Sequence, residues 1–291
     1  MPFNNKLLIV LTSGAQKQPA LERGRLIAKR LGATLHLMAD KKPETVEHDE
    51  WLQAVAQTQI DDGLDVVVDQ WQSADLLPNV LGILKKHGCG LLIKFSDQSN
   101  PLAEAFFTPR DWKLLRYAPC PVLMVKQQES WEGRALIAAI DADPDDQDHH
   151  LLNQQIIRMS AQIAELSGSN LHLVSAFPAP MQSADAHSQL REQIQHRYQQ
   201  NCEALCQQLD CQPDQIEVAE GPPETMIPAY SRSVSAALVI MGTVARKGLR
   251  GALLGGNTAE AILAQLRADV LTLNPRGSDE ILDILLQQQE D

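Results

Sequence analysis

The sequence predicts an α/β protein built from two tandem, doubly wound parallel-sheet domains. Three observations predict this class. Short apolar runs alternate with stretches of helical periodicity along the 291 residues. The order of motifs in the first half returns in the second half. Hydrophobic residues make up 44% of the chain and charged residues 21%, which is typical of a globular protein.

Five short apolar runs in the first half are typical of buried parallel strands, because helical segments separate them. We expect these strands near residues 6–11, 34–38, 64–70, 90–95 and 121–126. The second half predicts five more, near residues 135–141, 170–177, 215–219, 236–241 and 269–274. Each half is therefore expected to form five parallel strands joined by crossover helices.

The two halves repeat one pattern, which indicates a duplicated domain. "GATLHLM" begins at Gly32 and "GSNLHLV" begins at Gly168, and each follows an amphipathic stretch. We predict one domain over residues 1–130 and a second over 131–291, with a linker at 127–134. The second domain is expected to end in a short tail helix.

Charge and composition exclude several classes of function. The net charge is −12, and an acidic chain of this kind argues against binding to duplex nucleic acid. No apolar run reaches 18 residues, and "MPFNNKLLIV" has no charged n-region followed by an h-region, so we expect neither a membrane span nor a signal peptide.

Five cysteines without a C-x-x-C pair favour reduced thiols and a cytoplasmic location. Cys202 falls on an apolar helical stripe and is expected in the core. A zinc site with Cys206 and Cys211 is the alternative for this cysteine.

The stretch "MGTVARKGLRGALLGGNTAE", residues 241–260, combines glycine with positive charge. Gly242 lies at the expected carboxyl end of a strand, where open parallel sheets bind ligands. Asn257 and Thr258 begin a helix whose free N–H groups favour an anion. The three cations Arg246, Lys247 and Arg250 add charge. These features together predict a phosphate-binding loop, and a solubilising surface loop is the alternative.

This stretch resembles the nucleotide loop of the universal stress protein family, Gly-2x-Gly-9x-Gly followed by Ser, Thr or Asn. Here the motif starts at Gly242, with Ala245 where the second glycine belongs, and it carries one residue more at Gly255–Gly256. Taken with the duplication, the resemblance covers essentially the whole chain. It implies a tandem-domain member with the family's adenine nucleotide alpha hydrolase-like fold.

The resemblance also implies an ATP site in the second domain, with Mg²⁺ as a companion ion. Asp141 would face the adenosine and Ala176 would line the adenine, while Met241 and Gly242 would flank the ribose and phosphates. The full implied set is Asp141, Ala176, Met241, Gly242, Ala245, Arg246, Gly255, Gly256, Asn257 and Thr258.

The first domain lacks these features. Thr12 replaces Asp141, Phe95 stands opposite Gly242, and the sequence from Thr108 to Asp111 is typical of a helix N-cap followed by proline. We expect this domain to be structural and not to bind nucleotide by the same route. His36 and His172 alternate with leucines on matching strands, and we predict hydrogen-bonded structural roles for both.

The resemblance therefore implies a cytoplasmic stress-response regulator that binds ATP in its second domain. The alternative is a dimeric scaffold that binds no nucleotide and acts through protein partners. The sequence predicts no catalytic residue and no metal ligand, so any turnover would be that of a slow ATPase or phosphotransferase. The expected partners are the paired domains themselves, a second copy in a homodimer and an unidentified protein, with no nucleic acid and no membrane.

Overall fold

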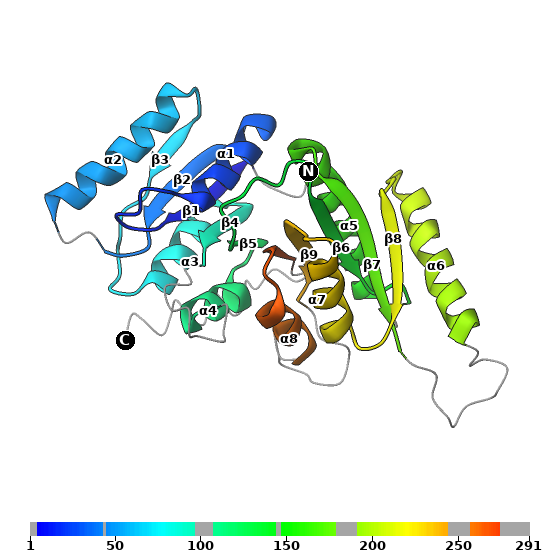
Figure 1. Cartoon of the computed structure of the whole chain (residues 1–291). Helices are drawn as coiled ribbons and strands as arrows, with labels where there is room; N and C mark the ends of the chain where they lie inside the picture. Colours follow the sequence, from blue (N-terminus) through cyan, green and yellow to red (C-terminus); the bar gives the residue numbers. More distant parts are fainter. Residues whose placement is uncertain are drawn as a thin grey trace. The chain divides into compact units, whose positions relative to one another are not determined.

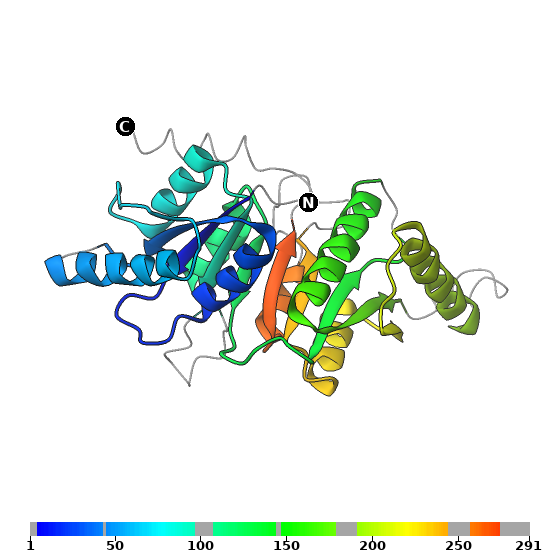
Figure 2. The ribbon, with the colours of Figure 1, turned by 90° about the horizontal axis from the view of Figure 1, so that it is seen from above.

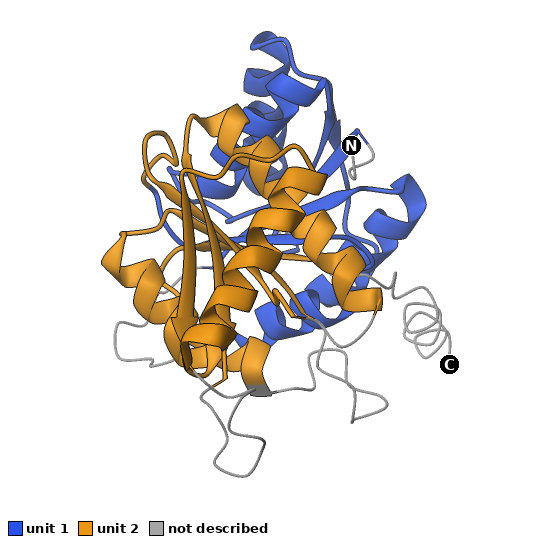
Figure 3. Cartoon of the chain, turned by 90° about the vertical axis from the view of Figure 1, so that its right-hand side faces the viewer, with its two compact units in different colours: residues 1–128, 276–291 blue, residues 129–275 orange. Residues whose placement is uncertain are grey.

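In the computed structural model, the chain forms two compact units, which lie within residues 1–128 and 129–275 (Figure 3). The structure describes residues 5–42, 45–96, 107–143, 147–178, 191–243 and 257–273. Among these residues, no helix is both long enough and apolar enough to span a membrane.

Unit 1 holds a parallel sheet whose described strands lie in the order β3-β2-β1-β4-β5 (Figure 1). These strands are β1 (Lys6–Leu11), β2 (Thr34–Ala39), β3 (Val66–Val68), β4 (Leu91–Phe95) and β5 (Val122–Val125). The helices between them are α1 (Pro19–Leu31), α2 (Val46–Asp61), α3 (Leu76–His87) and α4 (Pro109–Tyr117).

Unit 2 repeats this arrangement, with the described strands in the order β10-β9-β6-β7-β8. These strands are β6 (Ala135–Ile140), β7 (Asn170–Phe177), β8 (Gln215–Glu220), β9 (Leu238–Gly242) and β10 (Asp269–Leu273). The helices are α5 (Gln147–Ser167), α6 (Arg191–Gln208), α7 (Pro223–Ser233) and α8 (Asn257–Gln265).

Helices cover both faces of each sheet, so the central strands are buried on both sides. In unit 2, α5 and α6 lie over one face, and α7 and α8 lie over the other (Figures 1 and 2). Strand β6 runs from Ala135 to Ile140 without one exposed side chain. Burial on both faces explains why these strands are continuous apolar runs instead of alternating patterns.

Two glycines make the same turn in the two units. Gly32 follows α1 with φ of +61°, and Gly168 follows α5 with φ of +64°. This left-handed conformation ends a helix and favours glycine, because the other residues carry a Cβ. The matched "Gly-x-x-Leu-His-Leu" sequences therefore encode the same helix-to-strand turn.

The predicted fold class is confirmed, and most strands begin and end within a residue or two of their expected positions. The strand expected at residues 64–70 is shorter, since β3 covers only Val66–Val68. Single backbone hydrogen bonds extend its pairing with β2, from Leu35 N to Asp65 O and from Asp69 N to Leu37 O. Cys202 is fully buried in α6, as predicted.

Candidate functional site

The carboxyl ends of β6 and β9 lie side by side, because these parallel strands pair with Ala139 opposite Met241. Asp141 directly follows β6, and Gly242 is the last residue of β9. From β6 the sheet continues to β7 and β8 on one side, and β9 and β10 lie on the other. Asp141 and Gly242 therefore flank the point where the winding direction switches, the usual ligand position in open α/β sheets.

The end of β7 lies at the same edge. Ser175 pairs with Ile140, and the half-buried Ala176 is one residue further along. The structure thus brings Asp141, Ala176 and Gly242 to three neighbouring strand ends. That these residues bind a nucleotide stays a prediction.

Side chains from two helices hold the loop after β6 in place. Asn153 of α5 accepts a hydrogen bond from Asp141 N at 3.3 Å and donates one to Asp141 O. Asn201 of α6 donates to Ala142 O at 2.9 Å, and Arg197 pairs with Asp143 at 2.8 Å. The Asp141 carboxylate is therefore presented at the strand end by a loop whose backbone is anchored on both sides.

Gly242 has a packing role of its own. A Cβ at this position would press against the buried side chain of Leu152 in α5, with Leu152 Cγ only 3.0 Å away. Helix α5 can lie close to β9 because residue 242 has no side chain. A second role for this glycine, to let a phosphate approach the backbone, stays a prediction.

Other members of the predicted set lie along the chain after β9. Ala245, Arg246, Gly255 and Gly256 lie outside the described residues. The expected helix start is present, because α8 begins at Asn257 and Thr258 is exposed in its first turn.

In unit 1, the chain's own groups fill the start of the corresponding helix. Asp111 accepts hydrogen bonds from Thr108 N and Thr108 Oγ1, both at 2.9 Å, and Thr108 Oγ1 accepts one from Asp111 N. Lys94 pairs with the fully buried Asp111 carboxylate at 2.9 Å. The predicted helix cap is confirmed, and a carboxylate already occupies the position that favours an anion.

The loop after β1 in unit 1 is also closed by its own side chains. Gln18 accepts from Thr12 N at 3.0 Å and donates to Thr12 O at 2.7 Å. Asp40 accepts from both the backbone N and the hydroxyl of Ser13. At the position that corresponds to Asp141, unit 1 has Thr12, whose backbone N–H and C=O are both hydrogen-bonded by Gln18.

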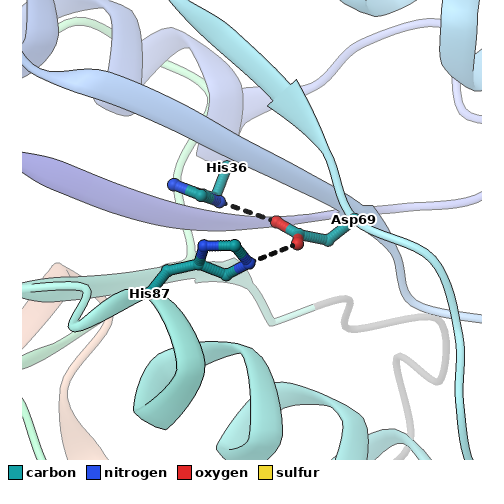
Figure 4. Close-up of side chains that lie close together, drawn as sticks. All are labelled: His36, Asp69 and His87. Atoms are coloured by element: carbon teal, nitrogen blue, oxygen red, sulfur yellow. Dashed lines mark hydrogen bonds and ion pairs between the residues drawn. The ribbon is translucent and has the colours of Figure 1, made fainter.

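Sequence reasoning missed one grouping in unit 1. The predicted hydrogen bonds of the two strand histidines are present, between His172 and Tyr230 and between His36 and Asp69. However, Asp69 also lies next to His87, so that two imidazoles flank one carboxylate (Figure 4). These residues are far apart in the sequence, and no local spacing signals their meeting.

Comparisons with known proteins agree with this architecture. Residues 138–274 match the model of the universal stress protein family. The universal stress protein E homolog of Haemophilus influenzae is 34% identical over 197 residues, which cover 65% of this chain and 63% of that protein. Universal stress protein E of Escherichia coli K12 is 27% identical over 303 residues, which cover 94% and 95%.

A solved structure from Pseudomonas aeruginosa UCBPP-PA14, provisionally assigned as a universal stress protein, extends the similarity to three dimensions. It is 36% identical, with a TM-score of 0.84, over 97% of this chain and 98% of that one. The chain therefore belongs to the universal stress protein family, a family of stress-response proteins.

Proposed function

We propose that this stress protein is a regulator that binds ATP in unit 2, at the carboxyl ends of β6, β7 and β9. The observation that carries the proposal is the position of Asp141 and Gly242, which end neighbouring strands on either side of the switch point. Reduced cysteines favour the cytoplasm as its compartment. A homodimer and an unidentified protein partner stay predictions.

The chemistry of these strand ends suits a nucleotide. The Asp141 carboxylate accepts hydrogen bonds. Because Asn153 already anchors its loop, little conformational entropy would be lost when a nucleotide binds. Ala176 is small and half-buried, so its own side chain would not block a flat base over the end of β7.

For the phosphates, we propose the glycine-rich sequence after β9. Arg246 supplies charge there, and Asn257 and Thr258 supply the first free N–H groups of α8. A triphosphate carries several negative charges, so Mg²⁺ would accompany it. In unit 1 the corresponding helix start is already occupied, since Asp111 caps α4 from within.

Calorimetric titration of the nucleotide-stripped full chain with ATP, with and without Mg²⁺, tests the proposal. Arg246→Glu should weaken binding by about tenfold or more, which corresponds to about 1.4 kcal/mol. Arg158→Glu is the matched control: Arg158 is exposed on α5, and its substitution changes the net charge equally. Asp141→Asn should also weaken binding while preserving the acceptor for Asp143 N.

The outcomes separate the two functions. Binding of ATP that Arg246→Glu weakens and Arg158→Glu leaves unchanged supports the nucleotide-responsive regulator. An absence of binding at millimolar ATP overturns it and favours the scaffold. Equal losses in both arginine variants would mean that ATP senses only the net charge of unit 2, which also contradicts the proposed site.

A further inference from the structure

We propose that unit 1 binds a divalent transition-metal ion, Zn²⁺ first among them, through His36, Asp69 and His87. Neither the family resemblance nor the nucleotide proposal assigns these residues a role. Among the described residues, no other three side chains of the metal-ligating types bring their ligand atoms so close together.

The distances suit a metal centre. His36 Nδ1 lies 2.8 Å from Asp69 Oδ2, and His87 Nε2 lies 3.1 Å from Asp69 Oδ1 (Figure 4). All three ligand atoms lie within 4.8 Å of one another. Zinc bonds of about 2.0–2.1 Å in tetrahedral geometry place ligand atoms roughly 3.3 Å apart. Shifts of a fraction of an ångström to about one ångström would therefore admit the ion.

Regular elements position each ligand. His36 lies within β2 between Leu35 and Leu37, neither of which is exposed. Asp69 follows β3, and its backbone N–H donates to Leu37 O at 2.8 Å. His87 is the last residue of α3. Because the three residues come from three packed elements, the ligand set is organised before an ion arrives.

Hydrogen bonding leaves one nitrogen of this cluster unsatisfied. His36 Nδ1 donates to the Asp69 carboxylate, whereas the buried His87 Nε2 lies near the same carboxylate without a well-aligned hydrogen bond. A buried nitrogen without such a bond is costly, and metal ligation would satisfy it.

Access also favours an ion. The His87 side chain is 22% exposed, whereas those of His36 and Asp69 are buried, so His87 is the ligand nearest to solvent.

Three protein ligands leave a fourth position for water. Cys89 is the nearest other ligand type along the chain, two residues after His87. Its thiol does not belong to the group of ligand atoms that lie within 4.8 Å of one another, so we do not count it among the ligands. A site with two histidines, one carboxylate and an open position is a known arrangement for zinc.

Unit 2 contains a natural comparison. His172 matches His36 in register, and Glu217 matches Asp69. There the histidine Nδ1 forms a hydrogen bond of 2.9 Å with the hydroxyl of Tyr230. A neutral phenol is a poor ligand for zinc, so unit 2 satisfies its strand histidine by hydrogen bonding alone.

The test uses the full chain without a histidine tag, treated with chelator and titrated with ZnCl₂ by calorimetry. One equivalent should bind with a Kd at or below the micromolar range, and the melting temperature should rise. CoCl₂ should give the intense visible absorption of tetrahedral Co²⁺. His87→Gln keeps an N–H donor near Asp69 but should lose at least about tenfold in affinity, a change of about 1.4 kcal/mol by the standard conversion.

Two further variants keep the outcome clear. Asp69→Asn preserves the shape of the side chain and should weaken Zn²⁺ binding similarly. The proposal then does not depend on the correct folding of His87→Gln alone. His172→Gln makes the same change as His87→Gln in unit 2 and should leave Zn²⁺ binding intact. Absence of micromolar binding, or equal affinity in wild type and His87→Gln, overturns the proposal. The proposal is also overturned if replacing His149 and His150, at the start of α5, by alanine removes the bound equivalent of Zn²⁺.

Discussion

Trp131 donates its indole N–H to Asp269 Oδ2 over 2.7 Å, although the two residues lie 138 positions apart. The indole is 1% exposed and the aspartate is fully buried. Residues 127–134 were expected to form a linker, and from residue 129 onward they belong to unit 2. The linker interpretation is therefore wrong for Trp131, because its side chain is part of the core of unit 2.

Replacing Trp131 by phenylalanine should destabilise unit 2 measurably. Phenylalanine keeps most of the apolar contact but removes the donor to Asp269, so a buried carboxylate loses one hydrogen bond. A loss of about 1–3 kcal/mol in the free energy of unfolding is expected from urea denaturation. Trp51→Phe, at a half-buried residue of α2, should change this free energy by no more than about 0.5 kcal/mol. Equal losses in the two variants would contradict a specific role for the indole N–H.

Thr108→Ala should destabilise unit 1 by about 1 kcal/mol or somewhat more, because it removes one partner of a reciprocal capping box. Thr45 caps α2 through a single longer contact, from His48 N at 3.4 Å, and Thr45→Ala should cost less. Thermal unfolding of the two variants side by side measures the difference. A larger loss in Thr45→Ala would show that the buried Asp111 does not depend on Thr108.

Much of the fold could be predicted from the sequence, because buried parallel strands are apolar runs with little ambiguity. The expected ranges 6–11 and 170–177 agree with β1 and β7. The edge strand β3 was overestimated, because only the three valines of "LDVVVDQ" pair in register with β2, while the polar Asp65, Asp69 and Gln70 lie outside the strand. The cap at Thr108 was predictable because all its partners lie within four residues.

The sites were less predictable, because they depend on distant residues. The pairing of β6 with β9 brings Asp141 and Gly242 together, and the sequence predicted only that each of them lies at the end of a parallel strand. The packing of Leu152 against Gly242 could not be predicted, since it depends on how closely α5 approaches the sheet. The meeting of His36 with Asp69 and His87 depends on three elements and has no sequence signature.

Gly242→Ala should destabilise unit 2 by about 1–3 kcal/mol, because the added Cβ forces the buried Leu152 side chain to move. The matched control is Gly82→Ala in α3, where an added Cβ meets no atom within 4 Å. That substitution should leave stability unchanged or raise it by about 0.5–1 kcal/mol, since alanine favours helix. Denaturant midpoints measure both changes, and a neutral Gly242→Ala would show that α5 shifts without cost.

This prediction also affects the design of ATP-binding experiments. A bulky residue at position 242 would perturb α5 and the anchored loop after β6 together, because Leu152 is followed in α5 by Asn153, which holds Asp141. Loss of ATP binding in such a variant would not distinguish phosphate approach from helix packing. Variants of Arg246 and Asp141 avoid this ambiguity.

Stability should fall below neutral pH in a way that depends on His172. Burial lowers the pKa of this imidazole, and the charge of Asp214 only partly opposes the shift. The unfolded chain, with a histidine pKa near 6.5, therefore binds a proton before the folded chain does. The contribution to the free energy of unfolding is fully present above about pH 6.5 and is lost as the pH falls through the lowered folded-state pKa.

His172→Gln should flatten that part of the pH profile. Glutamine keeps a polar group facing the hydroxyl of Tyr230 but has no proton to gain between about pH 7.5 and pH 5. Urea denaturation of wild type and variant, both with chelator present, isolates this histidine because the other titrating groups are common to both proteins. The difference in the free energy of unfolding between wild type and variant should be constant above about pH 6.5. Below that pH, wild type should lose stability relative to the variant, since only wild type must accommodate a half-buried imidazolium. Parallel profiles across the whole range would mean that the folded protein accepts the proton on His172 as readily as the unfolded chain.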